Sequence, residues 1–128
     1  MIGSSHISKN HWQEWLDSAV DQAIIELNVE SLSAQTPYER LLYNWDSGKV
    51  HPDAVWREIN RRFGDNWLDG GWWCSGVDVS TGEDSRWGCF KPNKPRADKS
   101  KGFDPNKPKP IKYEHPVKTP TEIFALRS

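Results

Sequence analysis

The chain has 128 residues, enough for one compact domain and too few for two ordinary ones. Hydrophobic residues make up 35% and the mean hydropathy is −0.83, so the core must be small, although eight Trp can each bury a large area. The sequence pI of about 6.4 argues against a free-standing, high-affinity nucleic-acid binder. The lack of any long apolar run or signal peptide predicts no membrane contact and a cytoplasmic location.

The first predicted element is helical. Apolar residues recur at helical spacing between residues 10 and 27, and either Ser8 or Asn10 can cap the start. A break near Asp21 would divide this stretch into two shorter helices, and the periodicity alone leaves both arrangements open.

Two further helices are predicted before residue 69. Thr36 and Glu39 form a capping box with Pro37 at the first helical position, which predicts a short helix through residue 43. Residues 53–63 have an apolar side and an arginine-rich side, and Gly64 suits a left-handed C-cap. We therefore expect residues 1–69 to form a helical N-terminal part.

A tryptophan-rich pair of strands is predicted next, at residues 71–78 and 85–92. The loop between them, residues 79–84, is rich in Ser, Thr, Gly and Asp, the residues that let a chain reverse. Because Trp72 and Trp73 are adjacent on one strand, they must point to opposite sides, so one of them is expected in the core and its neighbour at the surface.

Four prolines among Lys, Asn, Asp and Ser predict a long basic loop over residues 91–109. Residues 110–116 and 123–126 are then expected to form short extended strands. The predicted fold is therefore α+β, with small N-terminal helices followed by a small, mainly antiparallel sheet that carries the loop. Residues 70–128 would form this second part, within one compact unit.

Two Cys and two His are the residue types of a tetrahedral zinc site, the candidates being Cys74, Cys89, His51 and His115. The 14 residues between the cysteines match no common zinc spacing, however, and across an antiparallel pair the two thiols could face each other as small buried hydrophobes. We favour this second interpretation and expect neither metal nor cofactor. Two cysteines suit a reducing compartment but do not by themselves exclude a disulfide.

No local signature selects a nucleophile and base, and no glycine-rich phosphate loop precedes a helix. The sequence therefore gives little indication of catalysis.

The distribution of charge along the chain says more about function. Residues 1–90 hold 7 Lys or Arg against 14 Asp or Glu, whereas residues 91–118 hold 9 against 3. Such asymmetry indicates contact with a polyanion or self-association. Aromatic residues beside lysines can stack bases and hold phosphates, here Trp72, Trp73 and Trp87 with Lys91, Lys94 and Arg96.

Several segments together resemble the N-terminal region of cyanobacterial plasmid replication proteins, which carry a Toprim-like domain of primase type further along the chain. The matching segments are residues 11–21 (HWQEWLDSAVD), 27–32 (LNVESL), 38–43 (YERLLY), 71–78 (GWWCSGVD), 87–96 (WGCFKPNKPR) and 109–116 (KPIKYEHP). They cover nearly the whole chain in order.

The resemblance implies a DNA-replication-associated nucleic-acid-binding module, in plasmid or phage replication, that lies beside a template channel. It also implies a truncated or stand-alone copy that lacks the acidic Toprim motifs and the ATPase loop, so that no catalysis is expected from the isolated chain. Single-stranded or template DNA and a larger replication protein are the implied partners. The residues expected to contact nucleic acid are Lys91, Lys94, Arg96, Lys112, Tyr113 and Trp73. The alternatives are a protein-interaction or regulatory fragment that docks on a full-length replication protein, and a non-functional remnant.

Overall fold

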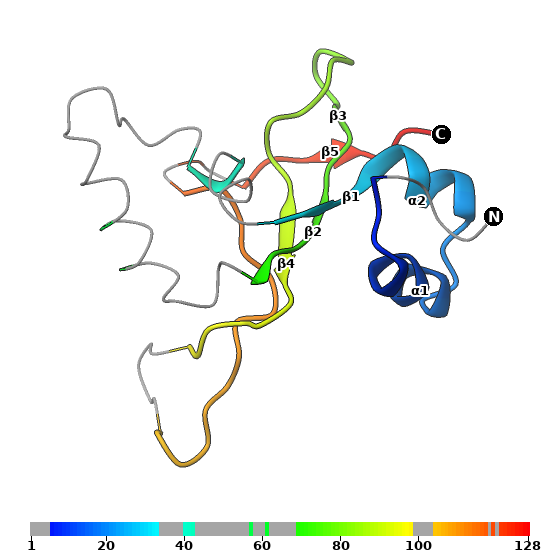
Figure 1. Ribbon diagram of the computed structural model, residues 1–128. Helices are drawn as coiled ribbons and strands as arrows, with labels where there is room; N and C mark the ends of the chain where they lie inside the picture. The colour runs from blue at the N-terminus through cyan, green and yellow to red at the C-terminus, as the bar shows by residue number, and fades with distance from the viewer. Residues whose placement is uncertain are drawn as a thin grey trace.

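The N-terminal segment forms two helices, α1 (Lys9–Asp17) and α2 (Gln22–Asn28), on the same side of the molecule (Figure 1). The computed structural model describes residues 6–33, 40–42, 57, 61, 69–98, 104–117, 119 and 121–128. Ser8 is the N-cap of α1 and accepts a hydrogen bond from the backbone N of His11 at 3.4 Å, as one of the two predicted alternatives has it. Asp21 caps α2 in the same way, accepting from Ala23 N at 2.9 Å.

Of the two arrangements that the periodicity left open, the structure has the divided one, with two helices. The backbone N of Ala19 donates to Leu16 O at 2.9 Å, and that of Val20 donates to Trp15 O at 3.4 Å, which is the hydrogen-bond pattern of a Schellman motif. Ala19 takes the left-handed conformation that this motif requires, with φ of 62°. Glycine usually occupies such a position, so the residue type gave no signal for the end of α1.

A three-stranded antiparallel sheet follows, with the order β1 (Val29–Leu32), β2 (Gly71–Cys74), β4 (Cys89–Pro92). The predicted pairing of the tryptophan-rich strands is confirmed for β2 and β4, and Cys74 lies directly opposite Cys89. Strand β1 was not predicted. It continues directly from α2 and is only four residues long, and it is extended because it pairs with a segment about 40 residues further along the chain.

The second half of the predicted strand pair differs from expectation. The chain turns away after Cys74, and β3 (Val77–Asp78) forms its ladder with β5 (Phe124–Ala125). The predicted pairing with the segment before β4 is reduced to an isolated bridge between Val77 and Asp84 and a hydrogen bond from Ser85 N to Gly76 O at 2.9 Å. A Cβ atom on Gly76 would lie 2.0 Å from the carbonyl oxygen of Ala125, so the absence of a side chain at this position permits the close approach. The strand predicted over residues 123–126 is thus confirmed as β5.

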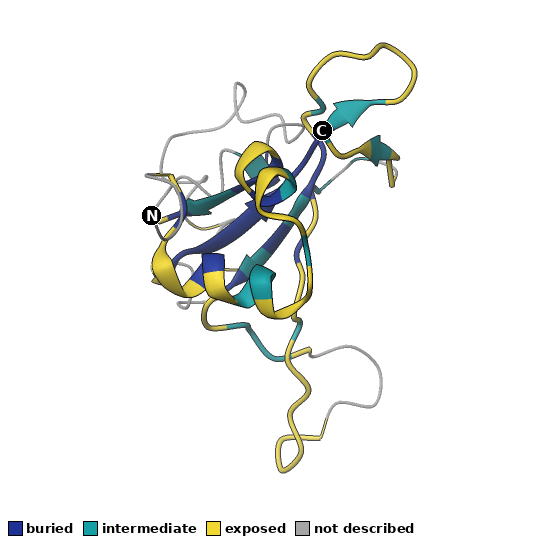
Figure 2. Cartoon of the chain, turned by 90° about the vertical axis from the view of Figure 1, so that its right-hand side faces the viewer, coloured by how far each residue is buried: buried dark blue, intermediate teal, exposed yellow. Residues whose placement is uncertain are grey.

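Both faces of the three-stranded sheet are covered, which corrects the expectation that one of Trp72 and Trp73 is at the surface. Trp72 packs with α1, α2 and the N-terminal segment, while Trp73 packs on the opposite face with Leu41, Leu42 and Phe90. Their exposed fractions are 6% and 3%. Figure 2 shows the buried strands beside helices whose outer sides are exposed.

Residues 109–117 run antiparallel to the β4 side of the sheet without forming the predicted strand over residues 110–116. Isolated bridges join Phe90 to Glu114 and Ala97 to Pro110. Pro110 and Pro116 have no backbone N–H to donate, so neither can add a donor to a ladder at the ends of this segment. Within the predicted loop over residues 91–109, the described residues after β4 make no regular strand.

The architecture is a small α+β fold with antiparallel sheets, as predicted. The helices expected at residues 36–43 and 53–63 lie mostly outside the described residues, and the division at residue 69 stays a prediction. In the part of the chain that the structure describes, no helix is long and apolar enough to cross a membrane.

Candidate nucleic-acid interface

The basic segment forms a projecting arm, which we call the basic arm and define as residues 91–98 and 104–114 (Figure 1). Its two sides are joined beyond the sheet by backbone hydrogen bonds. Ile111 N donates to Arg96 O at 2.8 Å, and Asp98 N donates to Lys109 O at 2.7 Å. The arm is therefore tied together at its base, and most of its described residues are exposed (Figure 2).

Exposed lysines lie along both sides of the basic arm, at positions 94, 107, 109 and 112. The side chain of Lys94 is 67% exposed and lies 3.4 Å from Asp69, which makes a loose ion pair. Among the described residues, no carboxylate forms an ion pair with Lys107, Lys109 or Lys112. Lys94 and Lys112 were predicted contacts. Lys107 and Lys109 were not singled out, although the charge count over residues 91–118 included them.

Arg96, another predicted contact, is bound to a carboxylate of the arm itself. Its Nε lies 2.7 Å from Oε2 of Glu114 and its Nη2 lies 3.1 Å from Oε1, a bidentate pair. Glu114 is 8% exposed, and its backbone also pairs in both directions with Phe90. Because a buried carboxylate needs a permanent counter-charge, Arg96 stabilises the base of the arm rather than offering a free cation.

Lys91, also a predicted contact, pairs with helix α1. Its Nζ lies 2.5 Å from Oε2 of Glu14, and the same oxygen accepts from the indole N–H of Trp72 at 3.1 Å. Burial acts to raise the pKa of Glu14, but the hydrogen bonds from Lys91 and Trp72 and the charge of Lys91 outweigh it. The pKa therefore lies below its ordinary value, and Glu14 is ionised at neutral pH.

The two predicted aromatic contacts have different environments. Tyr113 is 47% exposed, and its ring lies 6.1 Å from that of Trp72 at an angle of 53°, so one side of the phenol faces solvent. Trp73 is instead part of the core, and the guanidinium of Arg40 lies 5.9 Å from the centre of its ring. Its aromatic faces are thereby covered, so of the two predicted aromatic contacts Tyr113 is the one suited to base stacking.

Of the candidate zinc ligands that the structure describes, the two cysteines lie together, and His115 has a different neighbour. Cys74 and Cys89 are free thiols opposite one another on the α1 side of the sheet, whereas His115 stacks on Trp87 with ring centres 5.0 Å apart. Burial raises the pKa of each cysteine to about 11. His51 lies outside the described residues. Among those described, no three metal-ligating side chains come together.

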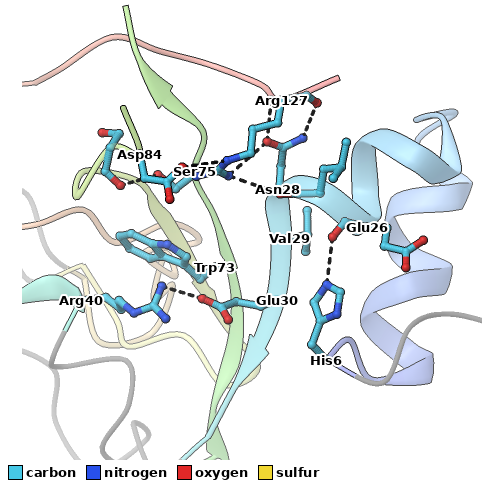
Figure 3. A pocket seen from close by; sticks show the side chains of 12 residues that line it. His6, Glu26, Asn28, Val29, Glu30, Arg40, Trp73, Ser75, Asp84 and Arg127 are labelled. Atoms are coloured by element: carbon cyan, nitrogen blue, oxygen red, sulfur yellow. Dashed lines mark hydrogen bonds and ion pairs between the residues drawn. The ribbon is translucent and has the colours of Figure 1, made fainter. Parts of the chain in front are cut away.

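A cleft of about 340 Å³ opens beside the edge of β1 (Figure 3). The α2–β1 junction, residues 73–75 and 84–85, and the C-terminal segment meet there. The charged side chains that line it are Glu26, Glu30, Arg40, Asp84 and Arg127, and His6 lies beside them. Arg40 pairs with Glu30 at 2.5 Å and Arg127 with Asp84 at 2.7 Å, so the guanidinium groups of the cleft are already bound by carboxylates.

The chain is 45% identical over 97% of its length to an uncharacterized protein of Picosynechococcus sp. (strain ATCC 27264 / PCC 7002 / PR-6), with 132 residues aligned. The aligned region is 12% of that relative, so this chain spans about an eighth of the relative's length. No protein-family model matches the chain, and no solved structure matches it.

Proposed function

We propose that this chain is a nucleic-acid-binding module associated with DNA replication, in which the basic arm holds the phosphates of single-stranded or template DNA. The observation that carries the proposal is the row of exposed lysines at positions 94, 107, 109 and 112 on an arm that projects from an acidic body. An ammonium group on a projecting segment can reach a phosphate without the cost of burying a charge.

Single-stranded DNA suits this surface better than a duplex. The half-exposed ring of Tyr113 lies next in sequence to Lys112, so a phosphate contact and a stacking surface are adjacent. An unpaired base can stack on an aromatic ring, whereas a base within a duplex is already stacked on its neighbours. Within residues 91–98 and 104–114, which the structure describes, no helix is present that could enter a major groove.

The link to replication is supported by the resemblance of six segments to plasmid replication proteins. The similarity to a much longer relative is compatible with a module that works within, or beside, a larger chain. A larger replication protein is therefore the proposed protein partner.

The test is a salt titration of binding to a fluorescent oligothymidylate of about 20 nucleotides, measured by anisotropy. We expect Lys109→Ala with Lys112→Ala to reduce the slope of log affinity against log salt by about 1.4, since each lost phosphate contact on a single strand contributes about 0.7. The matched control is Lys9→Ala with Arg57→Ala, which removes two exposed positive charges outside the arm and should leave the slope unchanged.

Two results would overturn the proposal. One is undetectable binding at low ionic strength. The other is an equal loss of affinity in the arm variant and in the control, because this would mean that only the overall charge matters. Tyr113→Ala should weaken binding at every salt concentration by about 1–3 kcal/mol, whereas Tyr113→Phe should bind as the wild type does.

A further inference from the structure

The two cysteines of the chain form a facing pair at the end of the three-stranded sheet. Cys74 is the last residue of β2 and Cys89 the first of β4, and they lie directly opposite each other in the antiparallel register (Figure 1). Cys74 is buried and Cys89 packs against the same cluster of buried residues, so both side chains are on the α1 side of the sheet. Both are free thiols, and the sequence has no third cysteine that would compete for either.

The backbone hydrogen bonds define the spacing of this pair. Phe90 exchanges both of its backbone hydrogen bonds with Glu114, at 2.9 and 2.7 Å. The N–H and C=O groups of the preceding residue, Cys89, therefore point the other way, towards β2. Cys74 and Cys89 are thus a hydrogen-bonded pair of the ladder, for which the two Cα atoms lie about 5.5 Å apart.

That spacing permits a disulfide with some strain. The Cα atoms of disulfide-bonded cysteines lie about 4.4–6.8 Å apart, so the two strands already have the required separation. Their Cβ atoms need to be about 3.8 Å apart, whereas facing Cβ atoms in a hydrogen-bonded pair are about 5.5 Å apart. Closing the bond therefore draws the ends of β2 and β4 together. Because a strained disulfide is reduced more readily than a relaxed one, such a bond is reversible.

We propose that Cys74 and Cys89 form a reversible thiol–disulfide site, which exchanges with low-molecular-weight disulfides and joins β2 to β4 when oxidised. Cys89 is the less buried of the two. Its thiolate attacks a disulfide R–S–S–R, which forms a mixed disulfide and releases one thiol R–SH. The Cys74 thiolate then attacks Sγ of Cys89 and releases the second R–SH. The protein loses two electrons and two protons, and the two R–SH molecules take up both.

The burial of the pair protects its reduced form and directs the second step. Burial raises the pKa of both thiols to about 11, so few thiolates are present at neutral pH and the first exchange is slow. Once Cys89 carries the mixed disulfide, Cys74 lies opposite it, so the bond closes without a second molecule. The closed loop spans 14 intervening residues and restricts the unfolded chain, which makes the oxidised fold the more stable one. Since β4 leads into the basic arm, redox state sets the stability of the sheet that carries the arm.

The test compares disulfide formation in the folded chain and in urea. The full chain is equilibrated at pH 8 in buffers of reduced and oxidised glutathione, starting from the reduced and from the oxidised form, and is then quenched with acid. Intact mass distinguishes the dithiol, the internal disulfide and the glutathione adduct. We expect the equilibrium constant to be about ten- to a hundredfold larger in the folded chain, which is the effect of closing a loop of about 15 residues less the strain. The oxidised chain should also unfold at a higher urea concentration, and a dithiol reductant should remove this difference.

The matched control is Cys74→Ala, which keeps Cys89 and removes the thiol that closes the bond. Glutathione should then accumulate on Cys89 as an adduct, with no gain in stability. Cys74→Val should give the same adduct, and its larger apolar side chain avoids the cavity that alanine leaves in the core.

The proposal is wrong if the equilibrium constant is no larger in the folded chain than in urea, or if the wild type yields only a glutathione adduct. Disulfide-linked dimers, or a folded chain that exchanges from neither starting form, would also exclude it. Oligothymidylate binding by the reduced chain does not depend on any of these results, so the redox site and the basic arm are tested separately.

Discussion

The side-chain amide of Asn28 forms two hydrogen bonds with the backbone of Arg127, 99 residues away in the chain. Its Nδ2 donates to the carbonyl oxygen of Arg127 at 2.9 Å, and its Oδ1 accepts from the backbone N at 2.7 Å (Figure 3). Asn28 is buried at the end of α2, so one side chain takes the place that a strand partner would otherwise fill. This contact connects the C-terminal segment to the helical part.

Replacing Asn28 by alanine should destabilise the fold by about 1–3 kcal/mol, because two backbone groups of Arg127 would lose their buried partners. Urea unfolding followed by tryptophan fluorescence measures the change. Asn28→Asp keeps an acceptor but places a carboxylate against the carbonyl oxygen of Arg127, so it should not restore stability. Wild-type stability in the alanine variant would show that water replaces both hydrogen bonds at no cost.

Removing Arg96 should destabilise the base of the basic arm. Arg96→Met leaves the buried carboxylate of Glu114 without its bidentate partner, and we expect a loss of about 2–3 kcal/mol, moderated because Arg96 is partly exposed. The double variant Arg96→Met with Glu114→Leu should recover part of this loss, since no buried charge then remains. If the loss of stability in the double variant equals the sum of the losses in Arg96→Met and in Glu114→Leu, the two side chains are not coupled.

Neutralising Glu14 should strengthen DNA binding. Glu14→Gln frees Lys91 from its ion pair, so one more cation becomes available beside the arm, and the salt slope should increase by about 0.7. The control is Asp17→Asn, an exposed position on the same helix, where the charge change is the same but no lysine of the arm is released. If both variants bind equally well, the gain reflects net charge and Lys91 makes no phosphate contact.

Replacing Ala19 by glycine should stabilise the chain. The left-handed conformation at φ of 62° costs a residue with a Cβ about 1–2 kcal/mol, whereas glycine adopts it without that strain. The greater freedom of glycine in the unfolded chain offsets part of this gain, so we expect a net increase of about 0.5–1 kcal/mol in the free energy of unfolding. Ala23→Gly, at an exposed position within α2, should have the opposite effect.

The two cysteines should react slowly in the folded protein. Burial raises the pKa of Cys74 and Cys89 from 9.0 to about 11, so the thiolate fraction at pH 8 is about 100-fold lower than in the unfolded chain. Reaction with a coloured disulfide reagent should be slower by at least that factor without urea than with it. Because the folded-state pKa values are raised, their contribution to stability is complete below pH 9 and declines as the pH rises towards 11. Equal rates with and without urea would contradict the burial of the pair.

The parts of the fold that were predictable depend on short-range patterns. Helical periodicity and a cap at either Ser8 or Asn10 predicted the helical start of the chain, and the tryptophan-rich segments predicted the pairing of β2 with β4. Strand β1 was missed because four residues after a helix have no distinctive pattern of their own. The register that pairs β3 with β5 joins segments more than 40 residues apart, and no local feature except Gly76 indicates it.

The candidate site, too, was predictable in part from the sequence and in part only from the structure. The charge count located the basic arm, but the structure shows that Lys91 and Arg96 are bound by Glu14 and Glu114. Glu14 is 77 residues from Lys91, so no spacing along the chain connects them. Lys107 and Lys109 belonged to the same charge count and could have been named with Lys94 and Lys112.

The sequence by itself determined the fold class, the asymmetry of charge along the chain and the position of the basic segment. These properties depend on composition and on patterns among residues that are close together in the chain. The tertiary structure alone decided which cations remain available for a phosphate and which aromatic ring remains exposed. These properties depend on which carboxylates and side chains packing brings from distant parts of the chain. Trp73 illustrates the difference, since its residue type suits base stacking while its position on a sheet covered on both faces makes it core.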